Sequence, residues 1–393
     1  MNSKVAVARC QSYEEMHIAE ALDRVFREID LAEIVKPGDL VLLKPNLLAP
    51  RKPEAAVTTH PAVVREVAKR VLALGARVML GDSSGGLVGG HYPTERSLRI
   101  SGMTRVCEEL GIETVNFDTA GNVRIPVAGR FLKELEVARP VLEADVIINL
   151  PKLKTHSATL YTGAVKNMFG AVPGSRKADY HSQAPSAREF NNLLVDIIQA
   201  LAPRLTIVDG VVGMEGNGPG AGSPVDIGLI VAGVNPVLVD AVCCRAIGLD
   251  PRRVRYLEEA ERRGLCSSLS GYDLVGDKVD FPVVKDFRFP VNLWFELNPP
   301  GITRFVMRRL KHLPFCDAEK CTGCNICRDS CPVQAITPKA GGEGVAVDRD
   351  KCIQCLCCQE LCPQGAFEIK ASSWLGALAM KIMAVMNGNG PLE

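Results

Sequence analysis

Short apolar segments alternate with longer amphipathic segments along the first three quarters of the chain. The apolar segments are rich in Val, Ile and Leu, as in buried strands, and read VAVAR, LVLLKPN, ARVMLGDSS, ETVNFD, ADVIINLPKLKTH, RLTIVDGVVGMEG and IGLIVAGVNP. Between several of them lie segments such as HPAVVREVAKRVLALG and REFNNLLVDIIQALAP, in which apolar residues recur every three or four positions. This alternation predicts an α/β domain with a largely parallel sheet over residues 1–298.

Polar side chains follow the apolar part of several predicted strands. Ligands of open parallel sheets bind beyond the carboxyl ends of the strands, so these side chains are expected to meet at one crevice. Any single one of them could mark a solvated strand end, whereas the set favours a site for a small anionic molecule. The substrate-binding residues predicted in this way are Lys44, Asn46, Asp82, Ser83, Lys152 and Lys154. The loops GDSSGGLVGGHYP and DGVVGMEGNGPGAGSP could either approach an anion or form ordinary turns.

Length and charge exclude several classes of protein. A chain of 393 residues is long enough for two or three domains. Its 46 Lys and Arg residues nearly balance its 45 Asp and Glu residues, so no basic field favours nucleic acid. No segment reaches the roughly 18 apolar residues of a membrane span, and the N-terminus lacks the apolar core of a secretory signal. Ten of the 15 cysteines cluster after position 315, which favours metal binding and a reducing cytoplasm.

The clustered cysteines form two copies of one motif, CTGCNICRDSCP and CIQCLCCQELCP, each with the spacing C-x2-C-x2-C-x3-C-P. In two-cluster ferredoxins, three close cysteines hold one iron-sulfur cube and the fourth holds the other cube. The predicted ligands of one [4Fe-4S] cluster are therefore Cys321, Cys324, Cys327 and Cys362, and those of the second are Cys352, Cys355, Cys358 and Cys331. Residues 314–371 resemble the bacterial two-cluster ferredoxin module.

Structural zinc is the alternative for these cysteines, but it does not explain a third cysteine at the same step in both copies. Cys357 and Cys316 fall outside the motif and are interpreted as thiols that do not bind metal.

Two further segments flank the ferredoxin module. Residues 299–313 begin with two prolines and continue into a basic stretch, which predicts a linker and a short helix that seats the module, or else a helix that docks a membrane surface or a partner. Residues 372–393 predict an apolar C-terminal helix, too short to span a bilayer, that packs on the body or across a homodimer.

The segment NLPKLKTHSATLYTGAVKNMFGAVPG carries a family resemblance. Together with LLKPN, GDSSGG, DGVVGMEGNGPGAG and NPVLVDAV, it resembles the family known as domain of unknown function number 362, which is often fused to a ferredoxin module of this kind. The resemblance covers roughly residues 38–250 and names no reaction.

A second resemblance, to the nickel-pincer lactate racemase family, rests on a G-x-H-x-P element and on a later His followed ten residues on by a Lys. GGHYP supplies His91, THSATLYTGAVKNMFGAVPG supplies His156 and Lys166, and His181 lies near the position of the family's nickel-binding histidine. The resemblance implies that His91 and His156 are acid/base residues and that Lys166 anchors a cofactor. The family's double glycine before the lysine is Gly-Ala-Val here, so a nickel-pincer cofactor is kept as an alternative.

These features together predict a ferredoxin-linked oxidoreductase. Two [4Fe-4S] clusters would exchange electrons with a small anionic substrate in the crevice, with His91, His156 and Lys166 as catalytic residues. The alternatives are a non-enzymatic electron carrier or iron-sulfur scaffold, and a racemase-like isomerase with accessory clusters. Lysines and histidines that converge in a crevice would separate an enzyme from a carrier. The expected partners are a ferredoxin or reductase and the small anion.

Overall fold

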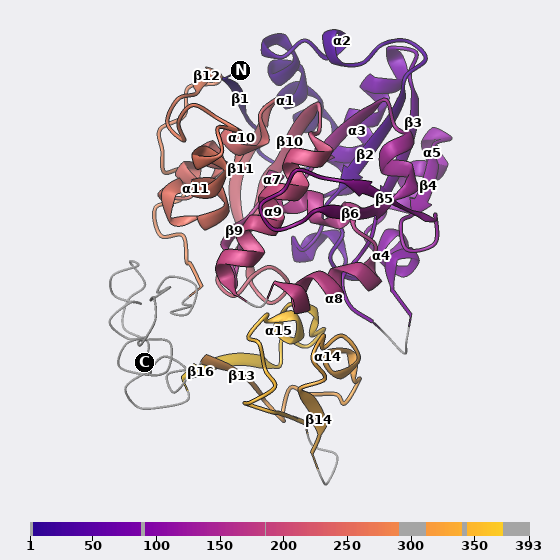
Figure 1. Ribbon diagram of the computed structural model, residues 1–393. Coiled ribbons are helices and arrows are strands. Elements are labelled where there is room, and N and C mark those ends of the chain that lie inside the picture. Colours follow the sequence, from indigo (N-terminus) through magenta and orange to yellow (C-terminus); the bar gives the residue numbers. More distant parts are fainter. Residues whose placement is uncertain (1–2, 88–90, 185, 291–311, 340–343, 372–393) are drawn as a thin grey trace.

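The computed structural model describes residues 3–87, 91–184, 186–290, 312–339 and 344–371 (Figure 1). A large α/β domain with a mostly parallel sheet is followed by a small cysteine-rich ferredoxin region, which confirms the predicted fold class. Most of the predicted linker and basic helix, and the whole predicted C-terminal helix, lie outside the described residues. Within the described residues, none of the helices has the length and apolar character that crossing a bilayer requires.

The sheet of the α/β domain follows the order β12-β1-β11-β10-β7-β2-β3-β4. The pairs from β10 through β7, β2 and β3 to β4 are parallel, whereas β11 runs antiparallel to both β1 and β10. The strands are β1 (Lys4–Arg9), β2 (Leu40–Pro45), β3 (Arg77–Asp82), β4 (Glu113–Asn116), β7 (Val146–Leu150), β10 (Leu205–Glu215), β11 (Ser223–Gly233) and β12 (Asp273–Gly276).

The segment ADVIINLPKLKTH, which reads as one strand, forms two. Strand β7 ends at Leu150, and β8 (Lys152–His156) begins after Pro151, which has no N–H to donate to a neighbouring strand. Strand β8 then leaves the neighbourhood of β2 and pairs with β10 and with β9 (Leu160–Thr162). This change of partner carries the following residues beyond the end of the sheet.

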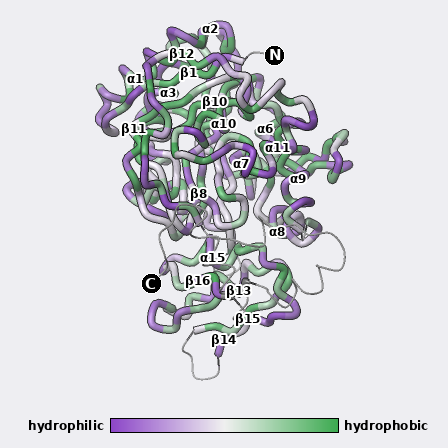
Figure 2. Tube along the Cα trace, turned by 90° about the vertical axis from the view of Figure 1, so that its left-hand side faces the viewer, coloured by the Kyte–Doolittle hydropathy of each residue, from purple (hydrophilic) through white to green (hydrophobic). Residues whose placement is uncertain are grey.

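Helices cover both faces of the sheet, and the pleat divides its side chains between two cores. Val41 and Leu43 belong to the core beneath α1 (Glu15–Glu28), α3 (Pro61–Ala73) and α5 (Met103–Leu110), whereas Leu42 belongs to the opposite core. The opposite face is covered by α9 (Ala187–Leu201), α10 (Pro236–Ala246) and α11 (Arg255–Arg262). Figure 2 shows the hydrophobic strands enclosed between more hydrophilic outer segments.

The predicted amphipathic segments form α3 and α9, and local capping explains where they begin. Ser186 Oγ accepts a hydrogen bond from the Glu189 N–H at 3.2 Å, and the Glu189 carboxylate accepts one from the Ser186 N–H at 3.1 Å. Pro61 occupies the first turn of α3, where a missing N–H costs nothing. The remaining elements of the domain are α2 (Leu31–Ile34), η1 (Pro53–Ala55), α4 (Thr94–Ile100), β5 (Asn122–Pro126), β6 (Glu134–Ala138), α6 (Arg139–Glu143), α7 (Ala164–Asn167), η2 (Met168–Ala171), α8 (Gly174–Gln183) and η3 (Pro251–Arg253).

The ferredoxin region contains two short hairpin-like sheets and two short helices. Strand β13 (His312–Cys316) pairs with β16 (Phe367–Ala371), and β14 (Ile336–Pro338) pairs with β15 (Val345–Val347). Strand β13 begins inside the range 299–313 that was predicted as linker and helix. Each helix, α14 (Ile326–Asp329) and α15 (Cys357–Leu361), follows the first two cysteines of a motif, and α15 faces the α/β domain (Figure 1).

The glycine loop, residues 83–87 after β3, packs against Leu361 of α15 and against Ser330, which directly follows α14. A Cβ atom added at Gly86 would lie 2.8 Å from the Leu361 Cδ1 atom of α15 and 3.2 Å from Ser330 Oγ, just after α14. The Leu87 N–H donates a hydrogen bond to Ser330 Oγ at 2.7 Å, and Arg51 donates one to the Cys362 carbonyl at 3.1 Å. This loop therefore serves close packing between the two parts of the protein.

Gly86→Ala is expected to loosen this packing. Gly86 has φ +78°, so alanine adds backbone strain of about 1–2 kcal/mol and also overlaps Leu361. Hydrogen exchange of the α15 amides should become faster. Gly111→Ala is the matched control, because Gly111 has φ +65° but open space around its Cβ position. Equal exchange of α15 in the two variants would contradict this account of the loop.

Candidate functional site

A cavity of about 160 Å³ lies between the strand ends of the α/β domain and the ferredoxin region. The α/β domain contributes basic and polar side chains from β8, α7, α8 and the loops after β2 and β3. The ferredoxin region contributes Asp329, Ser330, Cys331, Pro332, Cys357, Glu360 and Leu361. The predicted site residues that line this main cavity are Asn46, Asp82, Ser83, Lys154, His156 and Lys166.

Three lysines give the main cavity its positive charge. The Lys154 ammonium group donates to the Val57 carbonyl at 2.8 Å, Lys177 donates to the Ser83 carbonyl, and Lys166 lies 5.9 Å from the centre of the Phe190 ring. Among the described residues, no carboxylate lies within ion-pair distance of these three ammonium groups. An anion that enters the cavity would therefore meet ammonium groups that no carboxylate pairs directly, although Glu360, Asp82 and Asp118 act on them from farther away.

Removal from water shifts the pKa values of these lysines. Burial, together with the neighbouring charges of Lys166 and Lys152, lowers the pKa of Lys154 to about 7. Burial likewise lowers the pKa of Lys177 to about 8, although Asp82 and Asp118 act in the opposite direction. The pKa of Lys166 is also lowered by burial, against the influence of Glu360 and Cys357. The charge of the cavity therefore depends on pH near neutrality.

His156 links the α/β domain to the ferredoxin region. Its Nδ1 atom accepts a hydrogen bond from the Ala158 N–H at 3.0 Å, so the neutral ring carries its proton on Nε2. That Nε2 atom lies 3.1 Å from a carboxylate oxygen of Glu360, which comes from α15 between two cysteines of the motif. Burial, followed by the charges of Lys166 and Lys154, holds the pKa of His156 well below its usual value. The neutral ring thus presents a proton at the wall of the cavity.

His181, which also lines the main cavity, is held by aromatic packing. Its ring stacks on the Phe190 ring with the centroids 4.7 Å apart, and burial with the neighbouring Lys166 and Lys177 lowers its pKa to about 3. A neutral His181 therefore faces the same space as Lys166.

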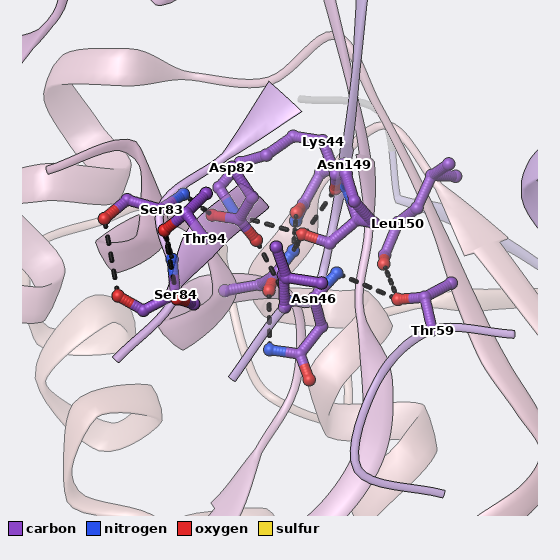
Figure 3. Close-up of polar contacts among 12 residues, drawn as sticks. Lys44, Asn46, Thr59, Asp82, Ser83, Ser84, Thr94, Asn149 and Leu150 are labelled. Carbon is purple, nitrogen blue, oxygen red and sulfur yellow. Dashed lines mark hydrogen bonds and ion pairs between the residues drawn. The ribbon is translucent and has the colours of Figure 1, made fainter. Parts of the chain in front are cut away.

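Lys44 and Asp82 form an ion pair beneath the main cavity (Figure 3). The Lys44 Nζ atom lies 3.0 Å from Asp82 Oδ1, and the carboxylate also accepts hydrogen bonds from the Leu47 and Ser83 N–H groups at 3.0 and 2.8 Å. Lys44 is fully buried, and a Cβ atom at Gly170 would overlap both charged groups. The ion pair holds the ends of β2 and β3 together beside Gly170, which lines the main cavity.

Three asparagines tie Lys166 to the strand ends. Asn167, next to Lys166 in α7, donates to Asn149 Oδ1 at 2.8 Å and accepts from the Asn46 side chain at 3.1 Å. Asn149 in turn donates to the Ala164 carbonyl at 2.9 Å. Figure 3 shows Asn46 and Asn149 beside Lys44 and Asp82. Asn46 therefore helps to position Lys166 as well as lining the cavity.

Lys152 and His91 do not line the main cavity. The Lys152 ammonium group lies 2.9 Å from Oδ2 of Asp209, a residue of β10, and 2.6 Å from the Tyr13 hydroxyl, in a buried network. The register between β8 and β10 shifts between the Asp209–Lys152 and Met214–Lys154 pairs, so Lys152 and Lys154 reach different surroundings. His91 is exposed, between the glycine loop and α4.

Sequence reasoning missed three charged residues of the main cavity, Lys177, Asp329 and Glu360. Lys177 lies in α8, whose residues SRKADYHSQ follow the Pro-Gly that ends the glycine-rich loop. Glu360 lies inside the second cysteine motif, where attention to ligand spacing leaves other residues unexamined. A search for charged residues between the cysteines of each motif could have found Glu360.

The cysteines surround two smaller cavities of about 20 Å³ each in the ferredoxin region. The first cysteine cavity is lined by Cys321, Cys324, Cys327 and Cys362, and the second by Cys331, Cys352, Cys355, Cys357 and Cys358. Among the described residues, no three His, Cys, Asp or Glu side chains converge on the position of a single metal ion. Backbone N–H groups of Ala335 and Ala366 donate to the sulfurs of Cys331 and Cys362, at 3.2 and 3.3 Å.

Lys152→Met is expected to lower the free energy of unfolding by about 3–5 kcal/mol, because it leaves the buried Asp209 carboxylate without its cation. Arg105→Ala, which removes an exposed ion pair with Glu109, is the control and should cost less than about 1 kcal/mol. Denaturant unfolding measures both changes. A Lys152→Met protein as stable as the control, but unable to bind anions, would instead place Lys152 in a binding role.

Comparisons with known proteins agree with the two parts of the structure. Residues 41–245 match the family described as domain of unknown function (DUF362), and residues 320–366 match the 4Fe-4S dicluster domain. The thylakoid-associated protein sll1697 of Synechocystis sp. is 35% identical over 268 residues, which cover 67% of this chain and 81% of that protein.

Among solved structures, the lactate racemase apoprotein from Thermoanaerobacterium thermosaccharolyticum is similar at a TM-score of 0.41 and 12% identity. The similarity covers 63% of this chain and 57% of that chain, and it is too low to decide a fold or a reaction. The matches to DUF362 and to the 4Fe-4S dicluster domain confirm the predicted resemblances to the DUF362 family and to the two-cluster ferredoxin module. The chain is an iron-sulfur protein that belongs to the DUF362 family.

Proposed function

We propose that this protein is an oxidoreductase in which two [4Fe-4S] clusters exchange electrons with a small anionic substrate in the main cavity. One observation carries the proposal: Cys331 and Cys357 line both the main cavity and the second cysteine cavity. A molecule bound among the three lysines would therefore be separated from a cluster by little more than these side chains.

The eight motif cysteines fit two clusters. Each cysteine cavity is lined by three cysteines of one motif and the fourth cysteine of the other, as crossed ligation requires. Hydrogen bonds from the Ala335 and Ala366 N–H groups to Cys331 and Cys362 stabilise thiolates, and bonds of this kind tune the potentials of such clusters. When bound, clusters of this type supply or accept single electrons.

The side chains of the main cavity supply binding and protons. Lys154, Lys166 and Lys177 would hold the anionic groups, and the low-dielectric setting strengthens this attraction relative to water. His156 would move a proton through Nε2, since its Nδ1 atom is occupied by the Ala158 N–H. Glu360, 3.1 Å from that Nε2 atom, would orient the ring. The side chains of Lys154, His156 and Lys166 converge in one cavity, and this convergence supports an enzyme over a carrier.

A racemase-like isomerase is the second candidate. It is favoured by the placement of His156, Lys166 and His181 around the same cavity, although His91 lies outside the lining. Metal analysis separates the two candidates, because an isomerase of that class would contain nickel. A ferredoxin or reductase as partner, a cytoplasmic location and dimer contacts of the C-terminal segment stay predictions.

The test compares Lys166→Ala and His156→Ala with the wild-type protein, all purified without oxygen. Each protein should contain about eight irons and eight sulfides, and dithionite should bleach the clusters equally. Small carboxylates and phosphates are screened for thermal stabilisation of the wild type, since a ligand at about 100 times its Kd adds about 2.7 kcal/mol. Turnover of the compound that binds should fall by about 100- to 10,000-fold in the variants.

Lys36→Ala, at an exposed lysine, is the control for loss of a positive charge. If no compound stabilises the wild type and the variants pass electrons at the wild-type rate, the protein is a carrier. Stoichiometric zinc without sulfide would exclude both clusters, and stoichiometric nickel would favour the isomerase.

Binding of a doubly charged anion should weaken as the pH rises. Only the protonated ammonium groups attract an anion, and their lowered pKa values of about 7 at Lys154 and about 8 at Lys177 place the loss of charge near neutrality. Affinity for sulfate, whose own charge is constant here, should fall between about pH 6 and pH 9, by at most about tenfold per pH unit for each lysine. Lys154→Met should flatten the lower part of this profile in calorimetric titrations. An affinity independent of pH would contradict the anion site.

A further inference from the structure

The ferredoxin region contains two copies of one cysteine motif, residues 321–332 and 352–363. The copies share their cysteine spacing but face different surroundings. Asn325 and Leu356 occupy equivalent positions before the two helices and share a positive φ, of 58° and 61°. Ser330 and Leu361 are likewise equivalent, and both contact the glycine loop of the α/β domain. The α/β domain therefore contacts both copies at equivalent positions, and the copies differ in some side chains and in what covers each one.

The loop of the second copy is sheltered, although residues 329–332 of the first copy also line the main cavity. In its loop, Gln354 is 5% exposed and Leu356 is 3% exposed. Helix α15 of this copy contributes Cys357, Glu360 and Leu361 to the wall of the main cavity. Cys357 stands where the first copy has Ile326, and it separates the second cysteine cavity from the main cavity.

The first copy is open to solvent at the equivalent loop. Thr322, Gly323 and Cys324 are all exposed, and a Cβ atom at Gly323 would meet no atom within 4 Å. Cys321 to Cys324 line the first cysteine cavity, so only this short loop separates that cavity from water on this side. Electron transfer between proteins weakens steeply with distance, and an exposed loop of small residues permits the closest approach of a partner.

We propose that the loop Thr322–Cys324 is the surface on which a one-electron carrier protein docks, and that the second cysteine cavity is the one that serves the main cavity. The carrier, of the ferredoxin or flavodoxin class, changes its oxidation state by one electron at each encounter. An electron from the carrier would enter at the first cysteine cavity and reach the substrate by way of the second. In the opposite direction, an electron from the substrate would leave by the same route. This inference rests on the two clusters of the proposed function but not on turnover of a substrate.

Charge changes at the two ends should therefore act on different clusters. Lys154→Met combined with Lys166→Met removes positive charge beside the second cysteine cavity, and Thr322→Glu adds negative charge beside the first. Each change disfavours addition of an electron nearby, so each should lower a reduction potential. In anaerobic redox titrations at about pH 6, where Lys154 is mostly protonated, half of the cluster signal should shift in each variant.

The two shifts should add in the combined protein, because distant changes act independently. Lys339→Met, in the same region but away from the main cavity, is the charge control. The assignment is overturned if the cavity variant and Thr322→Glu move the same half of the signal, if either moves both halves equally, or if neither moves a half.

Docking is tested by the rate at which reduced flavodoxin reduces the clusters. Thr322→Trp should lower the second-order rate constant by about tenfold, since bulk on the docking surface prevents close approach. Reduction by dithionite, a small molecule, should change much less. Thr337→Trp, at an exposed threonine of β14, is the matched control, and iron content is measured in each protein. Equal rates with flavodoxin for the two tryptophan variants would exclude this docking surface, whereas the proposed chemistry in the main cavity would stand or fall by its own variants.

Discussion

At the strand ends, almost no part of Lys44, Lys152 or Lys154 is exposed to water. Removing an ammonium group from water is costly unless a partner compensates for it. Lys44 and Lys152 each have a carboxylate at about 3 Å, from Asp82 and Asp209. Within the part of the chain that the structure describes, the Lys154 ammonium group donates to the Val57 carbonyl and has no carboxylate at ion-pair distance, and its pKa falls to about 7 as a result of burial and of neighbouring cations. The two paired lysines stabilise the ends of the sheet, whereas the third faces the main cavity without a carboxylate at ion-pair distance among the described residues.

The ferredoxin region contributes a carboxylate to the surroundings of these lysines. The Glu360 carboxylate acts electrostatically on Lys154 and Lys166, and it comes from α15 rather than from the α/β domain. Burial raises the pKa of Glu360, and the charges of Lys166 and Lys154 oppose that shift. The contact between His156 and Glu360 and the close packing of Gly86 on Leu361 therefore join electrostatics and shape at one interface. Separation of the two parts would open the cavity to water.

The repeated motif gives each cysteine cavity four cysteines at ligand spacing, and both Cys357 and the covering by the α/β domain make the two cavities unequal. Gln354 and Leu356 are sheltered whereas Thr322 to Cys324 are exposed, and the proposed docking of a carrier protein depends on this difference. Cys357 is the clearest departure from symmetry within the sequence, and it lies at the boundary between the two kinds of cavity.

The sequence by itself determined the class of the fold and the chemistry of the cysteines. Strand and helix periodicity is local, so the segments around Leu42 and Leu193 predicted their elements without knowledge of their neighbours. Cysteine spacing is local as well, and it gave two ligand sets that coincide with the two cysteine cavities. The tertiary structure alone decided which charged residues share a cavity. Lys152 and Lys154 are alike in sequence, but a register shift against β10 sends one to Asp209 and leaves the other at the cavity. Lys177 and Glu360 enter the site from α8 and α15 because long-range packing brings those helices to the strand ends, and no local pattern encodes that meeting.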